Sequence, residues 1–151
     1  MATLILLNKT ELPKGMPSEA LVAVWDKGSV PDGQISIPVE LNERLLPIRD
    51  ELAAWTYETG CARINGKLLE EHLRGDDNLS MWWCSTLVEK HPKVTHNLFT
   101  ALKLRALELL MGDKGVTRLE LHAAAGADSW MEDVLGRFCK ATGREFAVRR
   151  I

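Results

Sequence analysis

The sequence predicts an α/β fold, with a mainly parallel, Rossmann-like sheet of about four to five strands. Short apolar runs with the length of buried strands occur near both ends of the chain, and helical periodicity fills the middle. Residues 116–151 then read as strand, helix and strand, a span that suits one parallel crossover unit. The expected strands are 2–8, 20–25, 34–37, 116–122 and 145–151.

Each N-terminal strand is justified by its composition and its limits. Residues 2–8 and 20–25 are apolar and bounded by polar residues, which is typical of buried strands. The segment 9–18 contains two prolines and a glycine and is expected to be a loop. Turn residues at 26–33 precede 34–37, which forms either a short strand or an extended approach to the next helix.

A helical insertion is expected between the second strand and the C-terminal crossover unit. Residues 38–57 carry apolar side chains at helical spacing, and Pro47 predicts either a kink or a boundary between two helices. An Asn65-Gly66 turn follows, and Ser80 is expected to cap a helix that runs to about Lys90. The expected buried stripe of the first helical run is Leu41, Leu45, Ile48, Leu52 and Trp55.

The helix over residues 96–111 has the clearest pattern in the chain, and another helix is expected to start at residue 128 or 129. Three of the five tryptophans, Trp25, Trp55 and Trp130, fall at core-like positions. The expected buried stripes of these two helices are Leu98, Leu102, Ala106 and Leu109 in the first, and Trp130, Val134, Phe138 and Ala141 in the second.

Length, charge and cysteine content exclude several classes of protein. The 151 residues suit a single α/β domain. The 19 Lys+Arg against 21 Asp+Glu give a net charge of −2, which argues against a general nucleic-acid binder. Cys61, Cys84 and Cys139 lack zinc-site spacing, so no metal is assigned, and a reducing cytoplasm is the simplest location. No apolar run is long enough to form a transmembrane segment.

The most distinctive segment contains two adjacent tryptophans, Trp82 and Trp83. Neighbouring side chains on a helix lie about 100° apart, so both cannot enter one small core pocket. One is expected to pack inward and the other to sit on a rim, a groove or a partner surface. Two interpretations stay open: both rings pack against neighbouring helices, or they form an aromatic platform for sugars, bases or a protein partner.

Polar residues follow the tryptophans at helical spacing. Ser85 and Glu89 share one helix face, Trp82 lies roughly on it, and Lys90 comes next. Such a line suits a polar ligand with an apolar face, such as a sugar, and it equally suits a solvated helix face. On the following helix, Lys103 is expected to pair with Glu89 or to reach a phosphate.

A second candidate region lies where the strand 116–122 ends. His122 closes that strand, and the small residues up to Gly126 lead into the next helix. In open α/β sheets, ligands bind at the carboxyl ends of strands, and small residues let a ligand approach the backbone. The segment is not a GxGxxG motif or a P-loop, so a tight strand-to-helix turn explains it as well.

The run LSMWWCSTLVEKHPKVT, followed by TALKLRALELL, resembles the N-terminal region of a bacterial surface carbohydrate biosynthesis family. The resemblance covers residues 40–151, and its most specific part is the WWxSxxxEK core. The matching positions are Leu79, Ser80, Trp82, Trp83, Ser85, Glu89, Lys90 and Lys103.

The resemblance implies a place in O-antigen or capsule assembly, in long proteins related to two-domain glycosyltransferases with Rossmann-like halves. It implies that this chain is the N-terminal, acceptor-side half, without the half that binds the nucleotide sugar. The family brings no assigned catalytic residues. The chain also stops within its last expected strand, which fits either a strand that ends the protein or one piece of a longer polypeptide.

The first functional hypothesis is therefore a glycosyltransferase-like domain of bacterial surface polysaccharide synthesis, incomplete as an enzyme in this chain and without a cofactor. The residues named above would line a sugar or glycolipid groove, with Glu89 as the weak candidate for a base. The alternative is a non-catalytic module that presents the Trp82-Trp83 helix to a second domain or a second copy. A Rossmann-like small-molecule domain of another pathway is the third interpretation.

Overall fold

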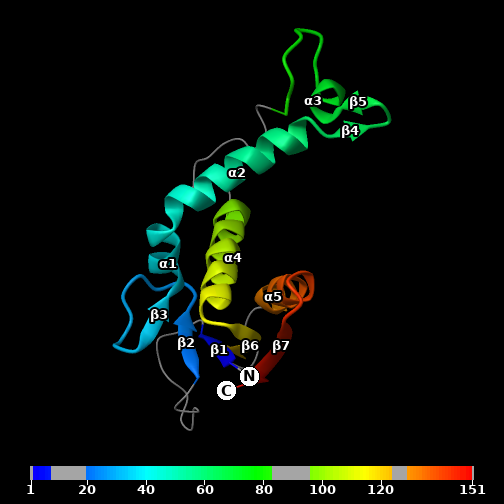
Figure 1. Cartoon of the computed structure of the whole chain (residues 1–151). Coiled ribbons are helices and arrows are strands. Elements are labelled where there is room, and N and C mark those ends of the chain that lie inside the picture. The colour runs from blue at the N-terminus through cyan, green and yellow to red at the C-terminus, as the bar shows by residue number, and fades with distance from the viewer. Residues whose placement is uncertain (1, 8–19, 83–95, 124–128, 151) are drawn as a thin grey trace. The chain divides into compact units, whose positions relative to one another are not determined.

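The computed structural model describes residues 2–7, 20–82, 96–123 and 129–150 (Figure 1). The chain divides into two compact units. The first unit combines Met1–Arg44 with Lys103–Ile151, and the second unit is the intervening Leu45–Leu102. Each unit is described by itself below.

The first unit is built on a five-stranded parallel sheet. All four strand pairs run parallel, in the order β3-β2-β1-β6-β7. The expected α/β fold with a mainly parallel sheet is confirmed, and every strand lies within one residue of its expected bounds. The strands are β1 (Ala2–Leu7), β2 (Leu21–Val24), β3 (Gln34–Ser36), β6 (Val116–Ala123) and β7 (Glu145–Arg150).

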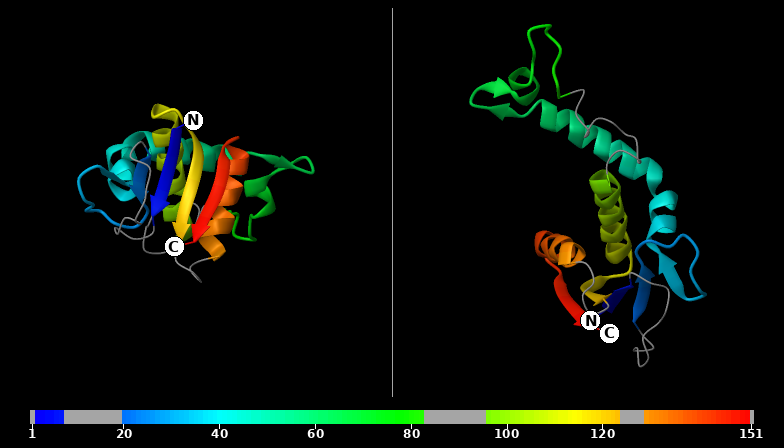
Figure 2. Two further views of the ribbon diagram at one scale, coloured as in Figure 1. Left: turned by 90° about the horizontal axis from the view of Figure 1, so that it is seen from below. Right: turned by 180° about the vertical axis from the view of Figure 1, so that it is seen from behind.

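The main core lies on one face of this sheet. Helix α4 (His96–Asp113) and helix α5 (Ser129–Ala141) bring Leu107, Leu110 and Leu135 onto Leu4 and Leu119 of the central strands. Figure 2 shows β1, β6 and β7 side by side with the helices behind them. Burying one such leucine contributes about 2 kcal/mol, so this face supplies most of the stability of the unit.

The opposite face of the sheet carries a smaller cluster. Ile5, Leu7 and Val24 are buried there, and Val30 packs against them. Val30 belongs to the connection between β2 and β3, so that connection lies over this face. The two faces of β1 are therefore both apolar, as expected for a central parallel strand.

The expected buried stripes of α4 and α5 are only partly right: Ala106 is buried as expected, but most of the other buried residues lie one position after the expected ones. In α4 the buried residues of the first unit begin at Lys103 and continue through Ala106, Leu107, Leu110 and Met111. In α5 they are Met131, Leu135 and Cys139, while Trp130 is half exposed. Both helices carry apolar residues at adjacent positions. The sequence pattern therefore indicates a helix but does not decide which of two adjacent apolar stripes faces the sheet.

Helix α1 (Ile37–Glu43) starts at a cap that the sequence analysis did not name. The Ser36 hydroxyl accepts a hydrogen bond from the Val39 amide at 3.2 Å. The helical run does divide in two, but the boundary is Arg44 rather than Pro47, because α2 (Leu45–Gly60) begins just before the proline. A proline is tolerated in a first turn, where its missing N–H has no helical partner.

The second unit contains α2, a hairpin and a short helix, and it occupies the place of the expected insertion. β4 (Arg63–Ile64) and β5 (Lys67–Leu68) pair antiparallel, and α3 (Leu69–His72) follows them. The expected turn is confirmed: Asn65 and Gly66 have φ angles of 50° and 83°, which a type I′ turn requires.

The buried stripe expected for α2 is only partly right. Ile48 is buried, but Leu45 and Trp55 are exposed by 43% and 49%. Within the described part of its unit, α2 packs on α3, a single helical turn, which covers little of its surface. The expected helix from Ser80 falls mainly on residues outside the described ranges, and Ser80 itself forms a bridge with Arg74.

Candidate functional site

The strand order defines one edge of the sheet as the candidate site. From β1 the chain proceeds to β2 and β3 on one side, then returns to β6 and β7 on the other. The order therefore reverses between β1 and β6, and ligands of open parallel sheets bind outside the carboxyl ends of strands at such a point. Asp26 follows β2 at this edge, and His122 lies next to the end of β6.

His122 is a buried imidazole held by a carboxylate. Its side chain is 1% exposed, and its Nε2 lies 2.7 Å from Oε1 of Glu120. Residues two apart on a strand share a face, which brings the two groups together. A carboxylate only accepts hydrogen bonds, so Nε2 carries a proton, and in the neutral imidazole the lone pair is then on Nδ1. That Nδ1 is buried and has no hydrogen-bond partner within the described ranges.

Charge on this face of β6 extends further along the strand. Arg118 lies 3.7 Å from Glu120 and 3.9 Å from Glu145 of β7. The register also places Arg149 of β7 beside His122. The charged side chains of β6 thus alternate with its core leucines, and the Arg118 guanidinium offsets part of the charge of Glu120.

Lys103 forms the second polar centre of this edge. Its side chain is only 7% exposed, its Nζ bonds Asp26 Oδ1 at 2.5 Å, and it lies 5.1 Å from the ring centre of Trp25. The sequence predicts a pair with Glu89 or a phosphate contact; in the structure the lysine pairs with Asp26, and Glu89 lies outside the described residues.

Two further interactions lie in the same region. Arg105 and Glu108, three positions apart, form an ion pair within α4 at 2.7 Å. Trp25 is buried at 4% exposure, as predicted, and its amide donates to the Leu7 carbonyl at 2.9 Å. That bond continues the pairing of β2 with β1 as far as Trp25. Asp26 is therefore the first residue beyond the paired part of the strand.

In the second unit, Trp82 packs inward, and Trp83 lies outside the described residues. Its side chain is 4% exposed, its ring lies against Gly60, and its Nε1 is buried without a hydrogen-bond partner in the portion of the chain described. Ser80 helps to fix this turn, since its hydroxyl donates to the Glu70 carbonyl and accepts from the Trp82 amide. Trp82 therefore has no exposed ring face with which to stack on a sugar.

The other residues named from the sequence lie outside the described ranges. They are Trp83, Ser85, Glu89, Lys90 and Gly126. Of the eight candidate ligand-binding residues named from the sequence, the structure thus describes three, which are Trp82, Lys103 and His122. Lys103 and His122 both belong to the first unit, at the carboxyl edge of its sheet, whereas Trp82 belongs to the second.

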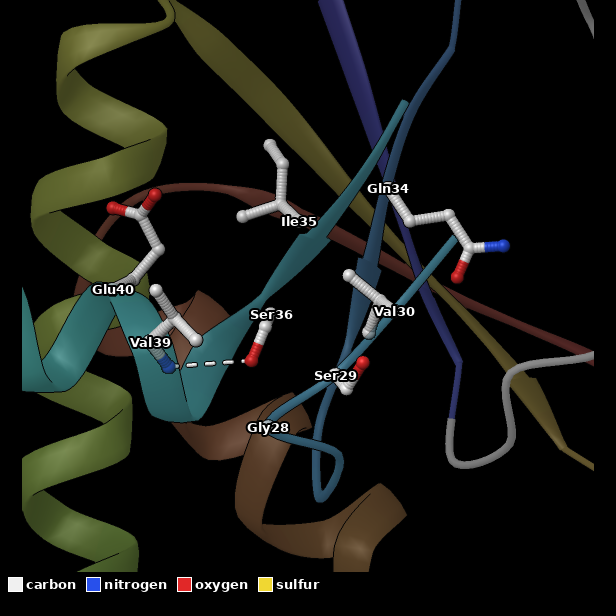
Figure 3. A pocket seen from close by; sticks show the side chains of 8 residues that line it. All are labelled: Gly28, Ser29, Val30, Gln34, Ile35, Ser36, Val39 and Glu40. Atoms are coloured by element: carbon white, nitrogen blue, oxygen red, sulfur yellow. Dashed lines mark hydrogen bonds between the residues drawn. The ribbon is translucent and has the colours of Figure 1, made fainter. Parts of the chain in front are cut away.

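A cavity of about 380 Å³ lies beside β3 and the start of α1 (Figure 3). Two of its polar side chains are bonded within the protein. The Ser36 hydroxyl donates to the Lys27 carbonyl at 2.6 Å, and Glu40 accepts from Arg44 at 3.1 and 3.2 Å. Its lining residues are Gly28, Ser29, Val30, Gln34, Ile35, Ser36, Val39 and Glu40.

Sequence reasoning missed Asp26 and Glu120, although each left a signal. Arg118, Glu120 and His122 alternate with two leucines, the pattern of a strand with one polar face. Asp26 directly follows an apolar strand, the position from which a side chain reaches the carboxyl edge. The partner of Lys103 left no local signal, because it lies 77 positions away.

Comparison with known proteins adds no relative: no family model, curated protein or solved structure matches the chain. In the described ranges, no three His, Cys, Asp or Glu side chains gather as a metal site requires. No helix among these residues has the length and apolar character needed to cross a membrane.

Proposed function

We propose that this chain is a glycosyltransferase-like α/β domain of bacterial surface polysaccharide biosynthesis, and that it binds the sugar or glycolipid acceptor. The resemblance of the WWxSxxxEK segment suggests the pathway. The parallel sheet, with its strand order reversing between β1 and β6, supports a ligand site at the carboxyl edge. The single observation that carries the proposal is His122, oriented by Glu120 and with an unpartnered Nδ1.

Glycosyl transfer needs a base at the acceptor. The acceptor oxygen forms a bond to the anomeric carbon of the activated sugar, the bond from that carbon to the leaving phosphate breaks, and the acceptor hydroxyl loses its proton. We infer that acceptor binding uncovers His122 Nδ1, which is buried in the free protein, and that this nitrogen takes the proton, since the other nitrogen is fixed by a carboxylate that stabilises the resulting imidazolium. The activated sugar would bind to the second half of the enzyme.

The test compares two candidate bases in the protein as expressed from its own gene. Transfer from nucleotide sugars to an acceptor glycolipid extract is measured for wild type, His122→Gln and Glu89→Gln. We expect His122→Gln to lower the rate by about 10²–10⁴-fold and Glu89→Gln to retain most of it. His72→Gln is the matched control, because His72 is exposed and its Nε2 bonds a backbone carbonyl in its own unit. Unchanged turnover in His122→Gln overturns this base.

A cytoplasmic location belongs to the same proposal. Cys61 and Cys139 are both free thiols, which suits a reducing compartment. The expected interaction module has less support, because the Trp82 ring that it would present is 4% exposed. Sedimentation over a hundredfold range of concentration separates the two: self-association that Trp83→Ala abolishes, with no response to sugars, would favour the module.

A further inference from the structure

We propose that Asp26 is the hydroxyl-binding carboxylate of the carboxyl edge. It accepts hydrogen bonds from the vicinal diol of a sugar ring, and Lys103 is the positioning residue that holds it. The inference rests on the proposed function in taking a carbohydrate as the ligand. The carboxylate, the ammonium and the ring of Trp25 form one contiguous group.

The first argument is the position of Lys103 on its helix. It is the only charged residue on the buried stripe of α4 within the described residues, which otherwise consists of Ala106, Leu107, Leu110 and Met111. Taking an ammonium out of water is costly, and replacing a buried ion pair by apolar residues is often neutral or stabilising. Stability alone therefore does not account for a lysine here, whereas a need to orient a carboxylate does.

The second argument is the exposure of Asp26. Its Oδ1 bonds the lysine, yet its side chain remains 53% exposed. An ionised carboxylate accepts about four hydrogen bonds through its two oxygens, so capacity remains for ligand hydroxyls. Hydrogen bonds to a charged acceptor are roughly twice as strong as those between neutral groups, and a carboxylate fixed by a buried cation loses less rotamer freedom when it binds.

The third argument is where the carboxylate lies relative to His122. Asp26 follows β2 and His122 is in β6, with β1 as the one strand between them. Two interstrand spacings, roughly 10 Å, separate the two strands, so a ligand at Asp26 lies at the same edge as His122 but on the α4 side of the sheet. The cavity of Figure 3 begins at Gly28, two residues after Asp26, and leaves room beside the loop for the rest of a ligand.

A vicinal diol reaches this edge either on an acceptor sugar or on the ribose of a nucleotide, and the experiment separates these sources. The 151-residue protein, labelled with ¹⁵N, is titrated with methyl pyranosides and, separately, with uridine. Amide shifts give Kd for wild type, Asp26→Asn and Asp113→Asn. Asp113 is the matched control, an exposed carboxylate of the same unit that pairs with Arg44 at 2.8 Å.

We expect Asp26→Asn to weaken binding at least tenfold and Asp113→Asn to leave it unchanged. Lys103→Met is expected to weaken it three- to tenfold, with an otherwise native amide spectrum. If uridine binds and the pyranosides do not, the diol site is supported but the proposal that the domain binds the acceptor sugar is overturned. If the pyranosides bind, the diol site and the acceptor proposal are both supported. Equal Kd values for wild type and Asp26→Asn, or no binding of either probe at 50-fold excess, overturn the inference. The proposed function is tested separately, by the transfer assay.

Discussion

The indole of Trp82 lies directly against Gly60, so close that a β-carbon at position 60 would overlap the ring. Gly60 is the last residue of α2, and a glycine at that place is usually read as a helix terminator. Here its second property matters more: the absent side chain leaves the space in which the ring is buried. The tryptophan and the glycine therefore form one packing unit.

Gly60→Ala is expected to destabilise the second unit by about 1–3 kcal/mol, the usual cost of overpacking a buried site. The added methyl group must displace the Trp82 ring. Urea unfolding followed by tryptophan fluorescence measures the effect, and a red-shifted native spectrum is expected if the ring moves towards water.

Gly112→Ala is the matched control, with the opposite expected sign. Gly112 lies in the last turn of α4, and nothing stands within 4 Å of its would-be β-carbon. Alanine is favoured over glycine in a helix by up to about 1 kcal/mol, so this variant should be slightly more stable than wild type. If both variants lose the same stability, the clash with Trp82 is not the cause.

The Asp26–Lys103 pair should respond asymmetrically to removal of each partner. Asp26→Asn removes the carboxylate charge that faces a buried ammonium and is expected to cost about 1–2 kcal/mol, less than a fully buried pair because Asp26 is half exposed. Lys103→Met extends the apolar stripe of α4 and should change stability by less than about 1 kcal/mol. Chemical denaturation of both variants checks the order, and a larger loss in Lys103→Met would contradict it.

Glu120→Ala should remove the preference of the His122 imidazole for one tautomer. With the carboxylate in place, the neutral imidazole carries its proton on Nε2. Without it, nothing favours that arrangement, and both tautomers become populated. Long-range ¹H–¹⁵N spectra of the imidazole distinguish the two states directly. Arg118→Ala is the control, since it removes a neighbour of Glu120 but leaves the acceptor of the histidine in place.

Cys139 should be the least reactive described thiol in the native protein. It is fully buried in α5, and burial raises the pKa of its thiol to about 11. Alkylation followed by mass spectrometry should modify the partly exposed Cys61 first and Cys139 only as the protein unfolds. Rapid labelling of Cys139 at neutral pH would contradict its burial.

The same shift predicts a pH dependence of stability. The folded pKa of Cys139 lies above the ordinary value of 9.0. Below that value the thiol is protonated in both states, so its contribution to stability is intact. Between about pH 9 and 11 only the unfolded state ionises, and the free energy of unfolding falls as pH rises. Cys139→Ala should lack this part of the pH slope.

The strands were predictable because their signal is local. Short apolar runs bounded by turn residues mark all five, and the span from 116 to 151 indicates a parallel crossover unit. The rotation of α4 and α5 was not predictable, since Leu109 and Leu110, or Trp130 and Met131, are neighbouring apolar residues that offer two stripes of equal spacing. Only packing on the sheet decides between them.

The candidate site was half predictable. His122 was found because a strand end in an α/β fold is a defined location, and Lys103 was found because a lysine among apolar residues is conspicuous. The partners of both depend on tertiary contacts. Glu120 can be identified as the partner of His122 only when it is known that both side chains lie on one face of β6. Asp26, the partner of Lys103, follows β2, which lies on the other side of the central strand β1 from β6.

The central place of β1 affects how the protein is made. On the ribosome β1 emerges before the other strands of its sheet, and its partner β2 soon follows, since Leu4 pairs with Leu21. Its other neighbour arrives late, because Leu4 also pairs with Leu119 of β6. At about 5–20 residues per second, several seconds pass in which one edge of β1 lacks its native partner. Such an apolar edge is where nascent chains mispair, so the sheet is most open to mispairing in the interval before β6 pairs with β1.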